Sequence, residues 1–408
     1  MEHKRGGLFG AATPPLEARH HASGLNSLFN GDQLSFADYV LKNRDMIRKI
    51  RSAADSDYPN QPTLNKVVEG NEPFALEPSG ADTAGKEKKF RRGILLTHGL
   101  SDSPYFMRHL AACFQANGFR VMAVLLPGHG TRPGDLLDVS WHEWARTVAY
   151  GTDKLAAEVD EVYLGGYSAG GALSIYQSLR DKRVRGLFLF APALEITHRA
   201  AYACLHKLVS WLMPRMKWVD IKPDKDIYKY ESFANNTATQ MHQLTLVLSD
   251  KLQLHELNIP IFTVASVEDK TVSTSATVEF MAQQSNPANK FILYTTDAEK
   301  RAKNAQAGKI EWVNSLLPEQ KILSSAHTAI LIPPEDEHYG VDGDYANCAH
   351  YYPDDMEKYD ACTMHPKECW QGEVTEQNLK AGTLRRLMYN PNFAALKTSL
   401  KQFVDNLP

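Results

Sequence analysis

A serine flanked by glycines lies where a predicted strand meets a predicted helix. The apolar run Val162–Leu164 leads into a G-x-S-x-G motif at Gly166–Gly170, and apolar residues with helical spacing follow it. Small neighbours let the backbone turn sharply and hold the hydroxyl of Ser168 away from the turn. The following helix directs its free N–H groups and positive dipole end at the same point. The stretch therefore predicts an oxygen nucleophile, the alternative being a structural turn with an incidental serine.

Short apolar runs alternate with amphipathic helical segments from Gly93 onward. The predicted strands are 94–96, 121–126, 162–164, 187–190, 261–264 and 291–294, and the intervening predicted helices are 104–117, 141–158 and 169–179. Such alternation predicts an α/β fold with a mostly parallel central sheet flanked by helices. Ligands of such sheets bind beyond the carboxyl ends of the strands, which is where Ser168 lies. Residues 73–76 are expected to add an edge strand.

The changes of pattern divide the chain into six segments. Residues 1–88 form an N-terminal extension with one helix that Ser35 can cap, 89–192 form the first part of the core, and 193–257 form a helical insertion. Residues 258–331 form the second part of the core, with a polar insertion near 297–320. Residues 332–390 form a cysteine-containing insertion, and residues 391–408 supply a C-terminal core helix.

The insertion 193–257 carries an apolar helical stripe with Leu208 and Leu212 on it and Trp211 beside it. An apolar helix placed after a strand and above the serine is expected to form a lid, the alternative being a subdomain with its own small core. We expect Leu208, Leu212 and Tyr167 to contact the substrate.

A serine hydroxyl needs an imidazole to accept its proton and a carboxylate to orient that imidazole. Asp269 follows a buried strand and is favoured over its neighbour Glu268, and His327 is the favoured base. Later histidines, namely His338, His350 and His365, are expected to be ordinary surface residues. After the first strong strand, Gly99 allows a turn in which the Leu100 N–H joins the Ala169 N–H as an oxyanion donor, while His98 braces the loop.

These motifs occur in the order typical of the α/β-hydrolase superfamily, and residues 93–179 most resemble bacterial carboxylesterases and monoacylglycerol lipases. The matching motifs are Leu96–Leu100, Pro127–Gly130, Gly166–Gly170, Asp269 and His327. The resemblance implies Ser168 as nucleophile, His327 as base, Asp269 as its orienting acid, and Leu100 with Ala169 as the oxyanion hole.

The resemblance also implies hydrolysis of a carboxylic ester, of single-acyl-chain or monoacylglycerol type, through an acyl-enzyme and without a cofactor. A thioesterase or an acyltransferase would use the same residues, and a non-catalytic binding protein on this scaffold is disfavoured because all three catalytic residues are present. The insertion 332–390 has no counterpart in the family and is the departure that can reach the substrate pocket.

Composition and charge limit which partners and which cellular compartment are expected for the protein. The net charge is −3 and basic residues form no long run, so nucleic acid is not an expected partner. No apolar run reaches the ~18–20 residues of a membrane span, although contact with a lipid substrate is allowed, and the oligomeric state stays open. No signal peptide is visible, so the expected location is cytoplasmic, or exported if Cys348, Cys362 and Cys369 form a disulfide. Free thiols or a zinc site are the alternatives for these cysteines, and no metal site is predicted.

Overall fold

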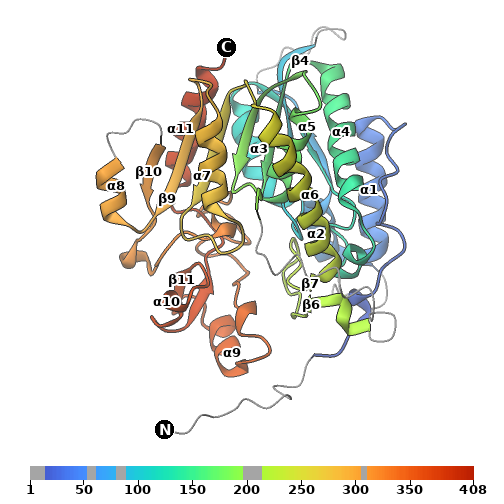
Figure 1. Cartoon of the computed structure of the whole chain (residues 1–408). Helices are drawn as coiled ribbons and strands as arrows, with labels where there is room; N and C mark the ends of the chain where they lie inside the picture. The colour runs from blue at the N-terminus through green and yellow to red at the C-terminus, as the bar shows by residue number, and fades with distance from the viewer. Residues whose placement is uncertain (1–13, 53–60, 80–88, 196–213, 305–309) are drawn as a thin grey trace.

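The computed structural model describes residues 14–52, 61–79, 89–195, 214–304 and 310–408. Its largest sheet has eight strands in the order β1-β3-β2-β4-β5-β8-β9-β10 (Figure 1). The strands are β1 (Phe74–Leu76), β2 (Phe90–Thr97), β3 (Phe119–Val124), β4 (Val159–Tyr167), β5 (Val184–Phe190), β8 (Ile261–Ser266), β9 (Lys290–Thr295) and β10 (Ile310–Asn314). Only β1 pairs antiparallel, with β3, so the predicted parallel sheet and its added edge strand are confirmed.

Helices cover the sheet and enclose a core of aromatic and branched side chains. They are α3 (Arg108–Ala116), α4 (Trp141–Glu158), α5 (Ala169–Ser178), α6 (Asn235–Leu254), α7 (Thr274–Gln283) and α11 (Phe393–Asp405). Phe188 of β5 is fully buried, and its ring lies 4.7 Å from that of Phe114 in α3 and 5.4 Å from that of Phe403 in α11. The helices 141–158 and 169–179 and the C-terminal helix therefore lie where the apolar periodicity predicts them.

The N-terminal extension packs on this core through α1 (Phe36–Arg51) and α2 (Gln61–Asn71). Ser35 caps α1 as predicted, because its hydroxyl accepts a hydrogen bond from the Asp38 N–H at 3.1 Å. The buried Tyr39 hydroxyl donates to the Leu125 carbonyl at 2.9 Å. These contacts hold the extension against the end of β3.

The predicted polar insertion near 297–320 contains α8 (Ala298–Asn304) and the eighth strand, β10. The sequence pattern does not predict this strand. Its residues are only partly buried, since β10 is the edge of the sheet and pairs with β9 alone. An edge strand needs no continuous apolar run, so the pattern that identifies buried strands is absent there.

Two smaller units lie at the carboxyl ends of the strands (Figure 1). One is the ribbon of β6 (Trp218–Asp220) and β7 (Phe233–Ala234); the other contains α9 (Met356–Met364), β11 (Trp370–Gly372), α10 (Glu376–Leu379) and β12 (Leu384–Arg386). Short 3-10 helices complete the described chain: Ala18–His20, Pro104–Met107, Pro133–Leu137, Pro214–Lys217, Pro318–Gln320, His327–Ala329 and Ala349–Tyr351. Leu208, Leu212 and the rest of the predicted lid helix lie outside the described residues.

A disulfide joins Cys348 to Cys362 across the second unit, with their Cα atoms 6.0 Å apart. Of the alternatives considered for these cysteines, the disulfide is the one present. Cys369 is a buried free thiol nearby in the same apolar cluster. Within the described ranges, no group of three or more His, Cys, Asp and Glu side chains is arranged to hold a metal ion.

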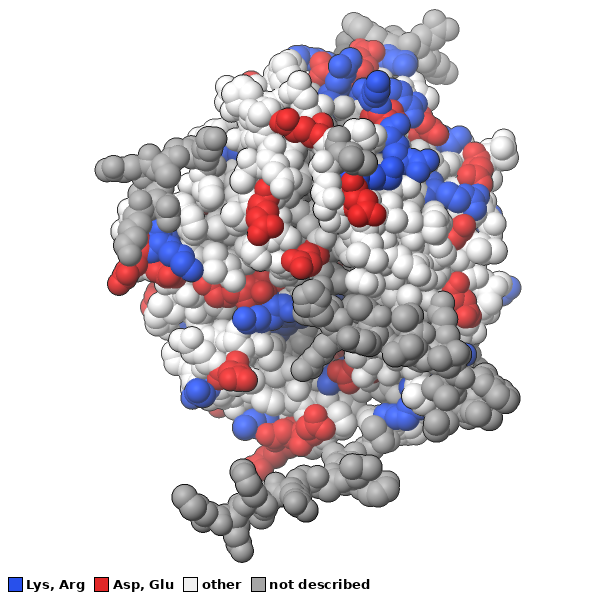
Figure 2. Space-filling model, in the orientation of Figure 1, with Lys and Arg blue, Asp and Glu red and all other residues white. Residues whose placement is uncertain are grey.

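Acidic and basic side chains are intermingled over most of the face in Figure 2, with basic residues gathered toward its upper right. No helix in the described part of the chain is both long enough and apolar enough to cross a membrane.

Candidate active site

Ser168 lies in a strained turn between β4 and α5. Its backbone has φ 53° and ψ −115°, a conformation that a side-chain-bearing residue rarely adopts. A Cβ at Gly166 would lie 2.1 Å from the carbonyl oxygen of Gly170, and a Cβ at Gly170 would lie 2.1 Å from that of Thr97. Glycine at both positions is therefore what lets the turn close against the end of β2.

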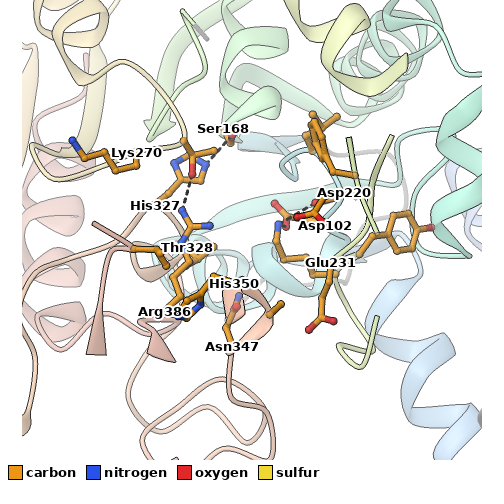
Figure 3. Close-up of a pocket in the computed structure, with 18 of the residues that line it drawn as sticks. Asp102, Ser168, Asp220, Glu231, Lys270, His327, Thr328, Asn347, His350 and Arg386 are labelled. Carbon is orange, nitrogen blue, oxygen red and sulfur yellow. Dashed lines mark hydrogen bonds and ion pairs between the residues drawn. The ribbon is translucent and has the colours of Figure 1, made fainter. Parts of the chain in front are cut away.

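The three residues that the sequence singles out for catalysis come together around the His327 ring; Figure 3 shows Ser168 and His327 side by side. The His327 Nε2 atom is 3.0 Å from the Ser168 Oγ atom, and Nδ1 is 2.6 Å from an oxygen of Asp269. All three residues are more than nine-tenths buried. With Nδ1–H donating to Asp269, Nε2 is left free to accept the serine proton.

Asp269, and not Glu268, faces the imidazole. The second oxygen of Asp269 accepts hydrogen bonds from the N–H groups of Thr271 at 2.7 Å and Val272 at 3.0 Å. Burial alone would raise the pKa of Asp269, but His327 and these N–H groups outweigh it and hold the pKa below its ordinary value. Glu268 instead accepts from the Thr296 N–H at 2.8 Å, at the end of β9.

Leu100 and Ala169 line the same cavity as Ser168 and His327. Neither N–H group donates to another residue in the described part of the chain. The Ala169 N–H is at the first turn of α5, where helix N–H groups lack intrahelical acceptors. Two backbone donors are thus available beside the serine.

A cation from a distant segment holds the Leu100 loop. Lys229 forms an ion pair with the buried Asp102, and its Nζ also donates to the Ser101 hydroxyl at 3.1 Å. The next residue, Tyr230, donates its N–H to the Ser101 carbonyl at 2.8 Å. Ser101 has φ 62°, so this segment fixes a loop residue in a left-handed conformation. No local motif in the sequence marks Lys229 for this contact.

His98 braces the loop, as the sequence analysis expects. Its Nδ1–H donates to the Gly99 carbonyl at 2.8 Å, and its Nε2 accepts from the Leu126 N–H at 3.1 Å. Burial and the neighbouring His129 lower the pKa of His98 well below its ordinary value. A neutral ring with both nitrogens occupied serves as a structural bridge between two turns.

Tyr167 does not contact the cavity, which corrects the expectation that it binds substrate. Its side chain is 1% exposed, and its hydroxyl donates to the His327 carbonyl at 3.1 Å. The ring stacks with Phe106 at 6.3 Å. Tyr167 is the last residue of β4 and its side chain packs in the core, whereas the next residue, Ser168, lies in the strained turn.

The cavity has a volume of about 750 Å³ and is built by distant parts of the chain. Apolar side chains line one part: Leu100, Ala193, Phe233, Ala238, Met241 and Val272. The insertion 332–390 reaches the pocket, as the sequence allowed, and contributes polar side chains that include Asn347, His350, Glu373 and Arg386. The volume falls within the ~300–1,000 Å³ typical of small-molecule sites.

Glu373 and Arg386 connect the loops that carry the base and the acid. One oxygen of Glu373 accepts from the His327 N–H and from Arg386, both at 3.0 Å. Arg386 also donates to the Thr271 hydroxyl at 2.6 Å, two residues from Asp269. No sequence motif marks either residue, and the only available signal is the position of their insertion directly after His327.

Comparisons with known proteins place the chain in a family. The family model for serine aminopeptidase, S33, matches residues 88–296, half of the chain. A thermostable monoacylglycerol lipase of Bacillus sp. (strain H-257) is 27% identical over 210 residues, which cover 50% of this chain and 77% of the lipase.

Two solved structures are similar at low sequence identity. A chain described with the metagenome-derived lipolytic enzymes LipS and LipT aligns at 20% identity with a TM-score of 0.46, covering 58% of this chain and 96% of that one. The monoacylglycerol lipase of Paleococcus ferrophilus aligns at 15% identity with a TM-score of 0.41, covering 55% and 88%. From the family match, the sheet order and the strained serine turn, the chain belongs to the serine aminopeptidase S33 family of α/β hydrolases.

Proposed function

We propose that the protein hydrolyses carboxylic esters with a single acyl chain through an acyl-enzyme formed on Ser168. The observation that carries the proposal is the continuous hydrogen-bond chain from Ser168 through His327 to Asp269 at a small-molecule cavity. The named activity of the Bacillus lipase supports the choice of ester.

In the proposed reaction, His327 takes the Ser168 proton while the serine oxygen attacks the ester carbonyl. Asp269 holds the ring in the required tautomer and stabilises the imidazolium. The N–H groups of Leu100 and Ala169 stabilise the oxyanion, each such donor being worth about 3 kcal/mol at the transition state. His327 then protonates the leaving alcohol, and a water molecule activated by the same ring releases the acid.

Three residues are proposed to position this machinery through hydrogen bonds to the loops that carry it. Tyr167 and Glu373 bond to the carbonyl and the N–H of His327, and Lys229 fixes the loop that carries Leu100. Their hydrogen bonds restrain the backbone on both sides of the catalytic groups, and small misplacements at such sites cost large factors in rate.

The test is hydrolysis of p-nitrophenyl esters of increasing acyl length, combined with labelling by an organophosphonate. We expect a single adduct on Ser168 and activity that rises and then falls with chain length as the apolar wall fills. Ser168→Ala should remove both the adduct and the activity. Ser178→Ala, in the helix that follows Ser168, should change neither the labelling nor the activity. An adduct on another serine would refute the assignment.

The same experiment separates the related reactions. Preference for a thioester over the matched ester would indicate a thioesterase, and product captured by an added alcohol instead of water would indicate an acyltransferase. The predicted lid, with Leu208 and Leu212, remains a proposal that a chain-length profile of Leu208→Ala and Leu212→Ala would test.

A further inference from the structure

The insertion 332–390 makes one end of the cavity polar. Asn347, His350 and Arg386 lie together below His327 in Figure 3. The backbone carbonyl of Asn347 accepts a hydrogen bond from the backbone N–H of Arg386 at 2.9 Å, so the segment before α9 is bonded to β12. The segment between β6 and β7 supplies Lys222, which also lines the cavity and donates to the Tyr352 carbonyl. We call Asn347, His350, Arg386 and Lys222 the polar end.

Arg386 has a donor directed to no protein acceptor. Its Nη2 is used by Glu373 and Thr271, but its Nε is buried and lacks a hydrogen-bond partner among the residues that the structure describes. Buried donors in proteins are nearly always satisfied. Since Arg386 lines the cavity, a bound molecule is a candidate acceptor for this N–H.

His350 has the same property. Both of its ring nitrogens are buried and make no hydrogen bond of ordinary geometry to another described residue. Burial, Arg386 and Lys222 lower the pKa of His350 to about 4, while the Leu384 carbonyl and Glu373 act in the opposite direction. The ring is therefore neutral at pH 7 and carries one N–H donor.

The charges around the ring favour a negatively charged ligand. Arg386 and Lys222 both disfavour a proton on His350, and together they outweigh Glu373 there. Glu373 is already occupied by His327 and Arg386, and Asp220 pairs with Lys222 at 3.0 Å. At the His350 ring, the two cations therefore outweigh the acid, although each cation is paired with a carboxylate and Asp354 also lines the cavity.

We propose that the polar end is a subsite for a carboxylate that the ester substrate carries away from its scissile bond. The Arg386 Nε–H and a His350 N–H donate to the carboxylate, and Lys222 adds a positive charge. This inference rests on the proposed esterase function and deepens it, since the substrate would have an apolar chain on one wall and an acid at the other end.

The test compares matched substrates. One arm uses 4-carboxyphenyl acetate against 4-carbamoylphenyl acetate, with the charge on the alcohol; the other uses p-nitrophenyl esters whose acyl chain ends in a carboxylate or in its primary amide. A charge-assisted hydrogen bond predicts about a tenfold preference in kcat/KM for the carboxylate in one arm. The arm that shows it identifies which part of the ester reaches the polar end.

Substitutions at the polar end test whether its side chains cause the preference for the carboxylate. His350→Ala and Lys222→Gln should each bring the carboxylate-to-amide ratio toward unity, and two separate positions guard against a misfolded variant. His365→Ala, in the same insertion but exposed, should keep the wild-type ratio. A ratio near unity in both arms for the wild type, or an unchanged ratio in both variants, would overturn the subsite.

Failure of the subsite differs from failure of the proposed function. If only the subsite is wrong, the wild type still cleaves the ester bond of the amide-bearing substrates, and the organophosphonate still labels Ser168. Without the esterase function, both of those signals are absent. In that case, calorimetric binding of the carboxylate and amide esters to Ser168→Ala still tests the polar end, because binding needs no turnover.

Discussion

The carboxylate of Glu373 accepts a hydrogen bond from the backbone N–H of His327 at 3.0 Å, across 46 residues of sequence. Glu373 is 1% exposed and is also paired with Arg386. The contact makes the insertion a support for the proposed catalytic base, and it places a buried carboxylate one hydrogen bond away from the backbone of that residue.

Glu373→Ala should therefore lower kcat by about tenfold with a smaller change in KM, because it leaves Arg386 and the His327 N–H unpaired and lets the base shift. Steady-state kinetics on a neutral ester measure the split. Partial recovery in Glu373→Gln, which keeps an acceptor oxygen, would support positioning. Glu368→Ala, exposed in the same insertion, is the matched control and should behave as wild type.

Asp269→Asn should reduce kcat by roughly 10³- to 10⁴-fold, the loss typical of a triad acid that can no longer select the tautomer. Glu268→Gln should reduce it only slightly, since Glu268 bonds to Thr295 and Thr296 instead of the imidazole. Turnover of a single p-nitrophenyl ester compares the two. Equal effects would argue against the assigned acid.

Lys229→Met should destabilise the fold by about 3 kcal/mol, because the buried Asp102 would lose its partner. The double variant Lys229→Met/Asp102→Asn should be more stable than the single one, since the uncompensated charge is then absent. Urea unfolding gives both values. If the double variant is no more stable than Lys229→Met, the pair is not the source of the loss.

His338 should stabilise the fold in a pH-dependent way. Burial opposes its charge, but Asp226 and Asp344 raise the pKa of His338 above its ordinary value. A raised folded-state pKa gives stability that is fully present below the unfolded pKa and is lost as the pH rises through the folded one. The Tm difference between wild type and His338→Gln should be larger at pH 6 than at pH 9, and a constant difference would contradict this account. Turnover should change little.

The disulfide predicts a redox-dependent stability. Cys348 and Cys362 are 14 residues apart, and closing a loop of about that length is worth roughly 3 kcal/mol in the unfolded-state model. Cys348→Ser/Cys362→Ser should lower the Tm, and reductant should lower the wild-type Tm but not that of the double variant. Cys113→Ser, at a free cysteine, is the control.

Disulfides such as Cys348–Cys362 persist in oxidising compartments. We therefore propose that the protein is exported and not cytoplasmic. Thiol counting by mass spectrometry on protein from its native source, blocked before lysis, would test this. Recovery of all five cysteines as free thiols would favour the cytoplasm.

The sequence by itself determined the central strands of the sheet, the serine turn and the candidate triad. Apolar runs buried on both faces identify central strands such as β4 and β5. Within the serine motif, Gly166 is required by its contact with the nearby backbone of Gly170. Asp269 and His327 could be assigned because, in this fold, the acid and then the histidine follow the serine along the chain.

Only the tertiary structure decided which residues surround that chemistry. Strand β10 is half-buried at an edge and has no apolar run, and Tyr167 is next to the serine yet points away from the cavity. Glu373 and Lys229 make hydrogen bonds to loops 46 and 128 residues away. The spacing of apolar residues indicates which face of one helix or strand is buried. These contacts instead depend on how separate segments of the chain pack together, and no local sequence pattern predicts that.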